Sequence, residues 1–291
     1  MTSSSPDLHA PDPTAPVLVV GATGKTGRRV AERLRSAGVP VRAASRRSGT
    51  PFDWDDPSGW PDALAGTRSA YVTYSPDLLV PAAAGALGRL AADAREAGLE
   101  QLVLLSGRNE PGAARAVEAA RAAGIPVTVL EAAWFLQNVT EGDFAPMVAD
   151  GVLALPVGEV PEPFVDVDDV AEVAVAALLD EAHRGRTYQV TGPRSLTFGE
   201  LAAELSRTSG REVRWVELGM AEAVDGWRAA GLPEEVVQLL GTLFGELFDG
   251  RSSRPADGVQ QVLGRPARDV REHLAHHAAA QSQVTCGATR V

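Results

Sequence analysis

The sequence predicts an α/β fold in which helices cover both faces of a doubly wound parallel sheet. Short runs of apolar, β-branched residues alternate with Ala-, Leu- and Arg-rich stretches of helical length, and several of these stretches end at a glycine. Strands that are apolar throughout are typical of a parallel sheet buried on both faces. Right-handed crossover connections then favour the doubly wound arrangement.

The first half of the chain carries the clearer pattern. Strands are expected at 16–20, 39–45, 69–74, 101–106 and 126–131. Helices are expected at 25–37, 79–97 and 112–123, and they are closed by Gly38, Gly98 and Gly124. Glycine ends a helix readily because it adopts the left-handed conformation without steric cost.

After about residue 140 the alternation loosens. Helices are expected at 170–179, 197–206, 220–230 and 234–248, and strands at 188–191 and 213–216. Asp168 and Asp169 are expected to cap the first of these helices. Residues 16–140 are therefore expected to form the larger domain. Residues 141–277 are expected to form a smaller C-terminal α+β lobe, partly interleaved with the sheet.

The composition narrows the class of protein. The polar ends, 1–15 and 278–291, lack periodicity and are expected to be disordered. No apolar run reaches the ~20 residues that span a bilayer, no apolar leader opens the chain, and the single cysteine, Cys286, excludes an internal disulfide framework. We therefore expect a cytoplasmic protein that does not act at a membrane.

The charge and the spacing of metal-ligand residues limit the partners. A net charge of −11 argues against nucleic acid, since phosphate backbones are bound by basic clusters. No grouping of His, Cys and acidic residues has the spacing of a metal site, so no metal is expected. A small-molecule substrate remains as the expected partner, and the sequence sets no oligomeric state.

A glycine-rich loop directly follows the first predicted strand and opens the first helix. Its glycines permit a tight turn and a close approach of backbone N–H groups to a pyrophosphate, while the helix N-terminus attracts the anion. One glycine could serve only a tight turn, but three at this spacing favour a Rossmann-type dinucleotide site. The expected cofactor-binding residues are Gly21, Thr23, Gly24, Lys25, Thr26 and Gly27.

The same loop does not fit a nucleotide-triphosphate P-loop. Gly24, Lys25 and Thr26 resemble the end of that motif, which requires a further glycine five positions before Gly24. Val19 occupies that position, inside the predicted strand. The P-loop interpretation therefore fails.

The end of the second predicted strand favours NADP(H) over NAD(H). NAD-specific folds usually place Asp or Glu there, about 20 residues past the loop, to accept the ribose 2′-hydroxyl. This chain has Ser45, Arg46 and Arg47 instead, whose hydroxyl and guanidinium groups suit a 2′-phosphate. A solvated surface pair of arginines is the alternative. Asp53 is a candidate partner for the adenine amino group, or a simple turn residue.

The sequence cannot build the Tyr-x-x-x-Lys pair of common short-chain reductases. Lys25 is its only lysine, and its tyrosines are Tyr71, Tyr74 and Tyr188. None of its five histidines follows a predicted strand facing the cofactor. The protein would then reduce an acceptor that needs no protonation, use a substitute such as Tyr74, Ser106 or water, or not catalyse at all. Proximity to a bound hydride donor could sustain a reaction without the usual acid.

Several segments match a known family in order and spacing, over the chain from 17 to about 274. They lie at 21–27, 44–47, 52–54, 104–106, 133–138, 163–171, 188–193 and 231–235. With these segments the chain resembles the NmrA-like atypical short-chain dehydrogenases/reductases. Within them it looks most like the ergot-alkaloid reductases of the agroclavine dehydrogenase and festuclavine synthase type.

The resemblance implies NADPH binding by the glycine loop and Arg46. It places the nicotinamide near Tyr74, Ser75, Ser106 and Gly107, and a substrate pocket near Trp134, Phe135, Asn138 and Phe164. The aromatic residues could equally be core.

The chain departs from the family in two places near that pocket. Where the family often has Arg before the Trp-Phe motif, this chain has Glu131, and the loop after Ser106 continues Gly107-Arg-Asn-Glu110. Glu131 could contact a cationic substrate or pair with Arg108.

The leading hypothesis is an NADP(H)-dependent oxidoreductase of secondary metabolism that transfers hydride to a small iminium or activated C=C substrate. A non-catalytic NADP(H) redox sensor is the second hypothesis. A cofactor-retaining protein that performs a non-redox isomerisation or cyclisation is the third.

Overall fold

A computed structural model describes the backbone of residues 14–288 and the side chains of residues 14–279. Most of the expected N-terminal arm, residues 1–13, and the last three residues lie outside this range. The chain divides into two compact units. The first comprises 14–105, 115–129 and 174–186, and the second comprises 106–114, 130–173 and 187–288. The expected division of functions at residue 140 stays a prediction.

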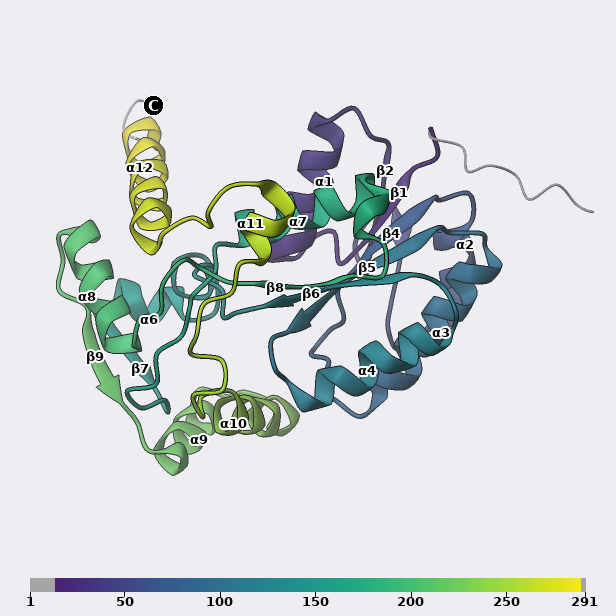
Figure 1. Cartoon of the computed structure of the whole chain (residues 1–291). Helices are drawn as coiled ribbons and strands as arrows, with labels where there is room; N and C mark the ends of the chain where they lie inside the picture. Colours follow the sequence, from purple (N-terminus) through teal and green to yellow (C-terminus); the bar gives the residue numbers. More distant parts are fainter. Residues whose placement is uncertain (1–13, 289–291) are drawn as a thin grey trace, which may run out of the picture. The chain divides into compact units, whose positions relative to one another are not determined.

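Seven strands form one sheet within the described residues (Figure 1). In sheet order they are β3 (Thr50–Pro51), β2 (Val41–Ser45), β1 (Val17–Val20), β4 (Ser69–Val72), β5 (Gln101–Gly107), β6 (Val127–Ala132) and β8 (Thr187–Val190). The pairs from β3 to β5 are parallel. The N–H groups of Val129 and Ala133 donate to the carbonyls of Arg186 and Val190, which gives β6 and β8 the same direction. The predicted fold class is confirmed.

Helices pack on the strands as the apolar pattern requires. In the first unit they are α1 (Lys25–Ser36), α2 (Trp60–Leu64), α3 (Ala82–Glu96) and parts of α4 (Pro111–Ala122) and α7 (Val167–Leu179). The buried face of α1 carries Val30 and Leu34, and all four residues of β1 are buried. Gln101 of β5 donates to the carbonyl of Ala177 in α7 at 3.0 Å. α1 therefore packs on β1 through its apolar face.

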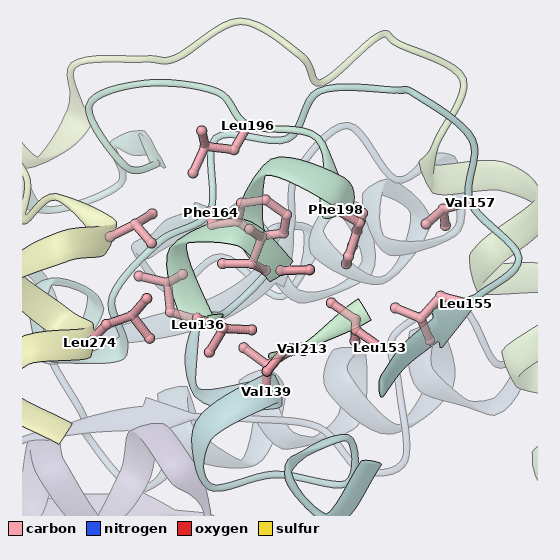
Figure 2. Packing of buried hydrophobic residues seen from close by; sticks show 14 of the residues in the cluster. Leu136, Val139, Leu153, Leu155, Val157, Phe164, Leu196, Phe198, Val213 and Leu274 are labelled. Carbon is pink, nitrogen blue, oxygen red and sulfur yellow. The ribbon is translucent and has the colours of Figure 1, made fainter. Parts of the chain in front are cut away.

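The second unit has its own small sheet and an aromatic core. β7 (Val152–Leu155) pairs in parallel with β9 (Arg214–Glu217). The helices are α5 (Gln137–Thr140), α6 (Ala145–Ala149), α8 (Phe198–Ser209), α9 (Met220–Ala229), α10 (Glu234–Leu247), α11 (Gly258–Leu263) and α12 (Val270–Ala288). Figure 2 shows Phe164, Phe198 and Leu153 inside its core, where the two phenylalanine rings meet edge to face at 5.0 Å.

One expectation of the sequence needs correction. α12 runs to Ala288, while the expected disorder of residues 278–291 stays a prediction. The expected cap of α7 is wrong by two residues: the Asp166 carboxylate, not Asp168 or Asp169, accepts a hydrogen bond at the helix start, from the Asp168 N–H at 2.8 Å. Asp169 is fully buried and pairs with Arg265 at 2.7 Å.

No helix among the described residues is both long enough and apolar enough to cross a membrane.

Candidate functional site

The glycine loop forms a tight turn at the carboxyl end of β1. Gly21 has a φ of +77°, a conformation that favours glycine. The N–H groups of Gly21 and Ala22 both donate to the carbonyl of Ala44, at 3.0 and 3.2 Å, and so tie the loop to β2. A Cβ added to Gly21 would lie 2.1 Å from Oγ1 of Thr73. The turn is therefore closed to any larger residue at this position.

The first turn of α1 packs directly on this loop. A Cβ added to Gly27 would lie 2.2 Å from the carbonyl oxygen of Gly21. Gly24 begins the helix with no side-chain cap, and the first turn has no acidic residue. The orphan N–H groups of such a helix start attract an anion. The chemistry of this cradle fits a pyrophosphate, and the cofactor-binding roles of Gly21, Gly24 and Gly27 stay predictions.

The turn after β2 carries the two arginines expected to bind the extra phosphate of NADP(H). The Ser45 N–H donates to Oγ of Ser48 at 2.7 Å, and the Ser45 hydroxyl accepts from the Arg47 N–H at 3.3 Å. Arg46 and Arg47 are exposed. Within residues 14–279 neither guanidinium has a hydrogen-bond or ion-pair partner. They are therefore available to an anion.

An aromatic cluster follows β3. Phe52 stacks on Trp60 at 5.5 Å, and Trp54 lies 4.7 Å from the Tyr74 ring. The Trp60 indole N–H donates to the Asp53 carbonyl at 2.8 Å, and the Asp53 carboxylate accepts from the Asp55 N–H at 3.1 Å. The structure thus gives Asp53 a turn role, and its contact with adenine stays a prediction.

The tyrosines of the first unit are poor acids. Burial, and after it the charge of Asp55, raises the pKa of Tyr74. Burial raises the pKa of the fully buried Tyr71 far more. Tyr74 is only half-buried and its neighbour Ser75 is exposed, so both stay candidates for contact with a cofactor.

Ser106 and Gly107, the other residues expected near the nicotinamide, belong to the second unit. Ser106 is buried, and its hydroxyl donates to the Gly107 carbonyl at 3.2 Å. A Cβ on Gly107 would lie 1.9 Å from the carboxylate of Glu110, so this carboxylate covers the Gly107 Cα. The proposed catalytic roles of Tyr74 and Ser106 stay predictions.

The expected substrate-binding residues divide by exposure. Glu131, Trp134, Phe135 and Asn138 are each partly exposed. Phe164 has no exposed surface: its ring packs against Phe198, as Figure 2 shows, and against Trp134 at 5.8 Å. Phe164 therefore supports Trp134 from within the core, in line with the core alternative.

Four polar side chains gather in the second unit where β5, β6 and β8 approach their carboxyl ends. Arg108 follows β5, Glu131 lies in β6 and Gln189 lies in β8. Arg108 Nε donates to Oε1 of Gln189 at 3.1 Å, and Gln189 Nε2 donates to the Glu131 carboxylate at 3.2 Å. Arg108 thus reaches Glu131 through Gln189. Glu162, which attracts Arg108 electrostatically, completes this carboxyl-edge cluster.

Glu162 and Gln189 are not among the site residues that the sequence predicts. Glu162 is 5% exposed, and its Oε1 accepts the Trp134 N–H at 3.1 Å. Burial raises the pKa of Glu162 to about 7, while the Trp134 N–H and the charge of Arg108 oppose the rise. The sequence feature that could have pointed to Glu162 is its position between two prolines, Pro161 and Pro163, in an otherwise apolar stretch.

Comparison with known proteins gives relatives along nearly the whole chain, although no family profile matches it. The chain is 35% identical to a (4-alkanoyl-5-oxo-2,5-dihydrofuran-3-yl)methyl phosphate reductase of Streptomyces griseus subsp. griseus, over 91% of this chain and 98% of that protein. It is 29% identical to an NAD(P)H azoreductase of Xenophilus azovorans, over 91% and 98%. It is 26% identical to agroclavine dehydrogenase of Claviceps fusiformis, over 87% and 93%.

Solved structures share the fold. An NADPH-dependent quinone oxidoreductase of Escherichia coli complexed with NADPH has a TM-score of 0.75 at 22% identity, over 89% of this chain and 99% of that one. The triphenylmethane reductase of Citrobacter sp. complexed with NADP(H) has a TM-score of 0.72 at 21% identity, over 90% and 99%. Together with the 35% identical relative, these similarities confirm the resemblance found in the sequence. The chain belongs to the NmrA-like family of atypical short-chain dehydrogenases/reductases.

Proposed function

We propose that the protein is an NADP(H)-dependent reductase of a small molecule whose C=C bond is conjugated to a carbonyl group. The single observation that carries the cofactor half of this proposal is the cradle formed by Gly21, Gly24 and Gly27. It leaves the backbone donors of the first turn of α1 without a side-chain cap. When bound there, NADPH would supply a hydride.

The choice of NADP(H) rests on charge. The 2′-phosphate is a dianion at neutral pH, and Arg binds such groups through paired, charge-assisted hydrogen bonds. Arg46 and Arg47 are exposed directly after β2, at the place where NAD-specific folds carry an acid. An acid there would repel the phosphate, so this turn supports a preference for NADPH.

The choice of acceptor rests on which proton donors the chain has. Carbonyl reduction creates an alkoxide that needs a strong acid partner, and the chain lacks the Tyr-x-x-x-Lys pair. A conjugated C=C bond leaves an enolate instead, which its carbonyl group stabilises. The 35% identical relative is named as a reductase of a dihydrofuranone phosphate, whose ring C=C bond is flanked by carbonyl groups. This name favours the activated C=C bond over the iminium ion.

Iminium reduction stays the second candidate. The relatives at 26% identity include agroclavine dehydrogenase and festuclavine synthase II. Glu131 is partly exposed and three residues from Trp134, so its carboxylate could attract a cationic acceptor.

The test combines binding and turnover. Calorimetry of the purified protein should detect NADPH with higher affinity than NADH. Stopped-flow loss of NADPH absorbance is then followed with an acyl-dihydrofuranone phosphate, other enones, quinones and cyclic imines. Oxidation of NADPH by the dihydrofuranone and the enones, with imines slower, is the expected result. Tight NADPH binding with no oxidation by any acceptor would contradict the proposal and favour the redox sensor.

A further inference from the structure

The Tyr71 hydroxyl is a buried polar group that has no hydrogen-bond partner among the described residues. Tyr71 belongs to β4, which pairs with β1, and it lies opposite Val19, two residues before the glycine loop (Figure 1). Its side chain has no exposed surface. A buried hydroxyl without a hydrogen bond destabilises a protein, and phenylalanine would fill nearly the same space without this cost. Packing alone therefore does not explain a tyrosine at this position.

The polar side chain that acts on Tyr71 is Thr26, in the first turn of α1. Burial raises the pKa of Tyr71, and the Thr26 side chain opposes this rise. Thr26 is itself only 4% exposed, so the two side chains approach each other inside the first unit. They do not reach hydrogen-bond geometry, since the Tyr71 oxygen has no partner in the described part of the chain. A small displacement of the first turn of α1 would complete the bond.

The same stretch of chain supports the glycine loop at a second point. Thr73 follows β4, and its hydroxyl donates to the Val20 carbonyl at 3.2 Å. A Cβ on Gly21 would lie 2.1 Å from this hydroxyl oxygen. Side chains two residues apart in an extended chain point the same way, so Tyr71 and Thr73 form one row. This row contacts the loop at Gly21 and the first turn of α1 at Thr26.

We propose that Tyr71 is a positioning residue for the dinucleotide: its hydroxyl forms a hydrogen bond with Thr26 as the first turn of α1 closes on the pyrophosphate. This inference rests on the proposed cofactor cradle and not on the choice of acceptor. The N–H groups of a helix start bind an anion, and their direction depends on how the first turn lies on β4. A hydrogen bond that forms only in the complex strengthens binding without stabilising the free protein.

The experiment compares Tyr71→Phe with Ser69→Ala. Ser69 lies two residues earlier on the same face of β4, and its hydroxyl is also buried without a partner in the described range. Each variant therefore removes one such hydroxyl from one strand, and Tyr71→Phe removes the one beside Thr26. Calorimetry measures the affinity for NADPH, NADH and 2′-AMP, the last of which has the 2′-phosphate but no pyrophosphate. Thermal unfolding of the free protein measures stability.

Tyr71→Phe should lower the affinity for NADPH and for NADH by the same factor, roughly 3- to 10-fold, the equivalent of one neutral hydrogen bond. The affinity for 2′-AMP should stay at the wild-type value. The melting temperature of the free protein should be unchanged or higher, because an unpartnered buried hydroxyl is removed. Ser69→Ala should leave all three affinities unchanged.

Thr26→Val tests the partner, because valine keeps the shape of threonine and removes its hydroxyl. It should weaken NADPH binding by a similar factor. The double variant of Tyr71→Phe and Thr26→Val should lose no more affinity than the weaker-binding single variant, since both changes remove one shared hydrogen bond. Losses that multiply in the double variant would overturn the pairing of the two hydroxyls.

Three further results would overturn the role of Tyr71. They are an unchanged NADPH affinity in Tyr71→Phe, an equal fall in Ser69→Ala, and a fall that extends to 2′-AMP together with a lower melting temperature. The last is what a purely structural role produces. A wild type that binds no NADPH would overturn the cradle, and this role with it. A wild type that binds NADPH but reduces no acceptor would overturn the proposed reaction alone, because the test of Tyr71 measures affinity and not turnover.

Discussion

The Cα of Gly27 lies so close to the carbonyl oxygen of Gly21 that a Cβ on Gly27 would approach this oxygen to 2.2 Å. The contact joins the first turn of α1 to the end of β1, so it sets the distance between the helix N-terminus and the loop. A phosphate held by that helix start depends on the same distance.

Gly27→Ala should therefore weaken NADPH binding at least tenfold and lower the melting temperature, because the helix must move away from the loop. Calorimetry with NADPH and thermal unfolding measure both effects. Gly85→Ala is the matched control: Gly85 is exposed in α3 with no atom near its Cβ position. It should leave NADPH affinity unchanged and stabilise the protein slightly, since Ala favours a helix by ~1 kcal/mol over Gly. Equal NADPH affinity in Gly27→Ala and wild type would contradict the cradle.

Arg46→Ala should lower NADPH affinity and leave NADH affinity unchanged. Hydrogen bonds to charged groups contribute about 1.5–3 kcal/mol, so the NADPH-over-NADH preference should fall roughly 10- to 100-fold. Binding titrations with both cofactors measure it. Arg35→Ala removes an equally exposed arginine from α1 and serves as the control. If the NADPH-over-NADH preference survives in Arg46→Ala but is lost in Arg47→Ala, Arg47 is the residue that binds the 2′-phosphate.

Trp134 and Phe164 should respond differently to replacement by leucine. Trp134 is partly exposed, so Trp134→Leu should raise the KM for the acceptor several-fold with a small loss of stability. Phe164 is fully buried, so Phe164→Leu should cost about 1–3 kcal/mol of unfolding free energy and change KM little. Steady-state kinetics and urea unfolding of the two variants give the comparison. A larger KM effect in Phe164→Leu would place its ring in the pocket.

Asp166 should make the protein sensitive to acid. Burial raises the pKa of Asp166, but the hydrogen bond and the charge of His273 outweigh burial and keep it well below its ordinary value of 3.8. The stabilisation is therefore present above pH 3.8 and is lost as the pH falls towards the folded-state pKa. Asp166→Asn should lower the free energy of unfolding at neutral pH by about 1–3 kcal/mol. It should also reduce the further loss of stability as the pH falls. Urea unfolding across this range tests it, with the exposed Asp150→Asn as the neutral control.

Glu162 should have the opposite effect on stability. Its folded-state pKa of about 7 lies above its ordinary 4.5, so between these values the folded state binds a proton that the unfolded chain has lost. Stability should consequently fall as the pH rises across this window. Glu162→Gln should remove that fall, on the order of 1–3 kcal/mol, whereas Glu131→Gln should retain it. A wild-type stability that is flat across this window would contradict the raised pKa.

The local pattern was sufficient for the regular part of the fold. β1 and α1 lie within one or two residues of their predicted bounds, because an apolar run, a glycine turn and a helical stretch follow one another directly. β7 was missed since its four residues form a strand only by pairing with β9, some sixty residues later in the chain. The sequence predicts no helix where α12 lies, because its Ala- and Gln-rich end has a weak apolar pattern.

The sequence by itself determined the glycine cradle and the arginine turn after β2, since both depend on residues that are neighbours in the chain. Only the tertiary structure decided that Phe164 is core and that Glu162 is a buried acid. The contacts that define Glu162 come from Trp134 and Arg108, twenty-eight and fifty-four positions away. The pKa of a carboxyl group depends on how much solvent and which charged groups surround it. These neighbours come from distant parts of the chain, so they are known only once the chain has folded.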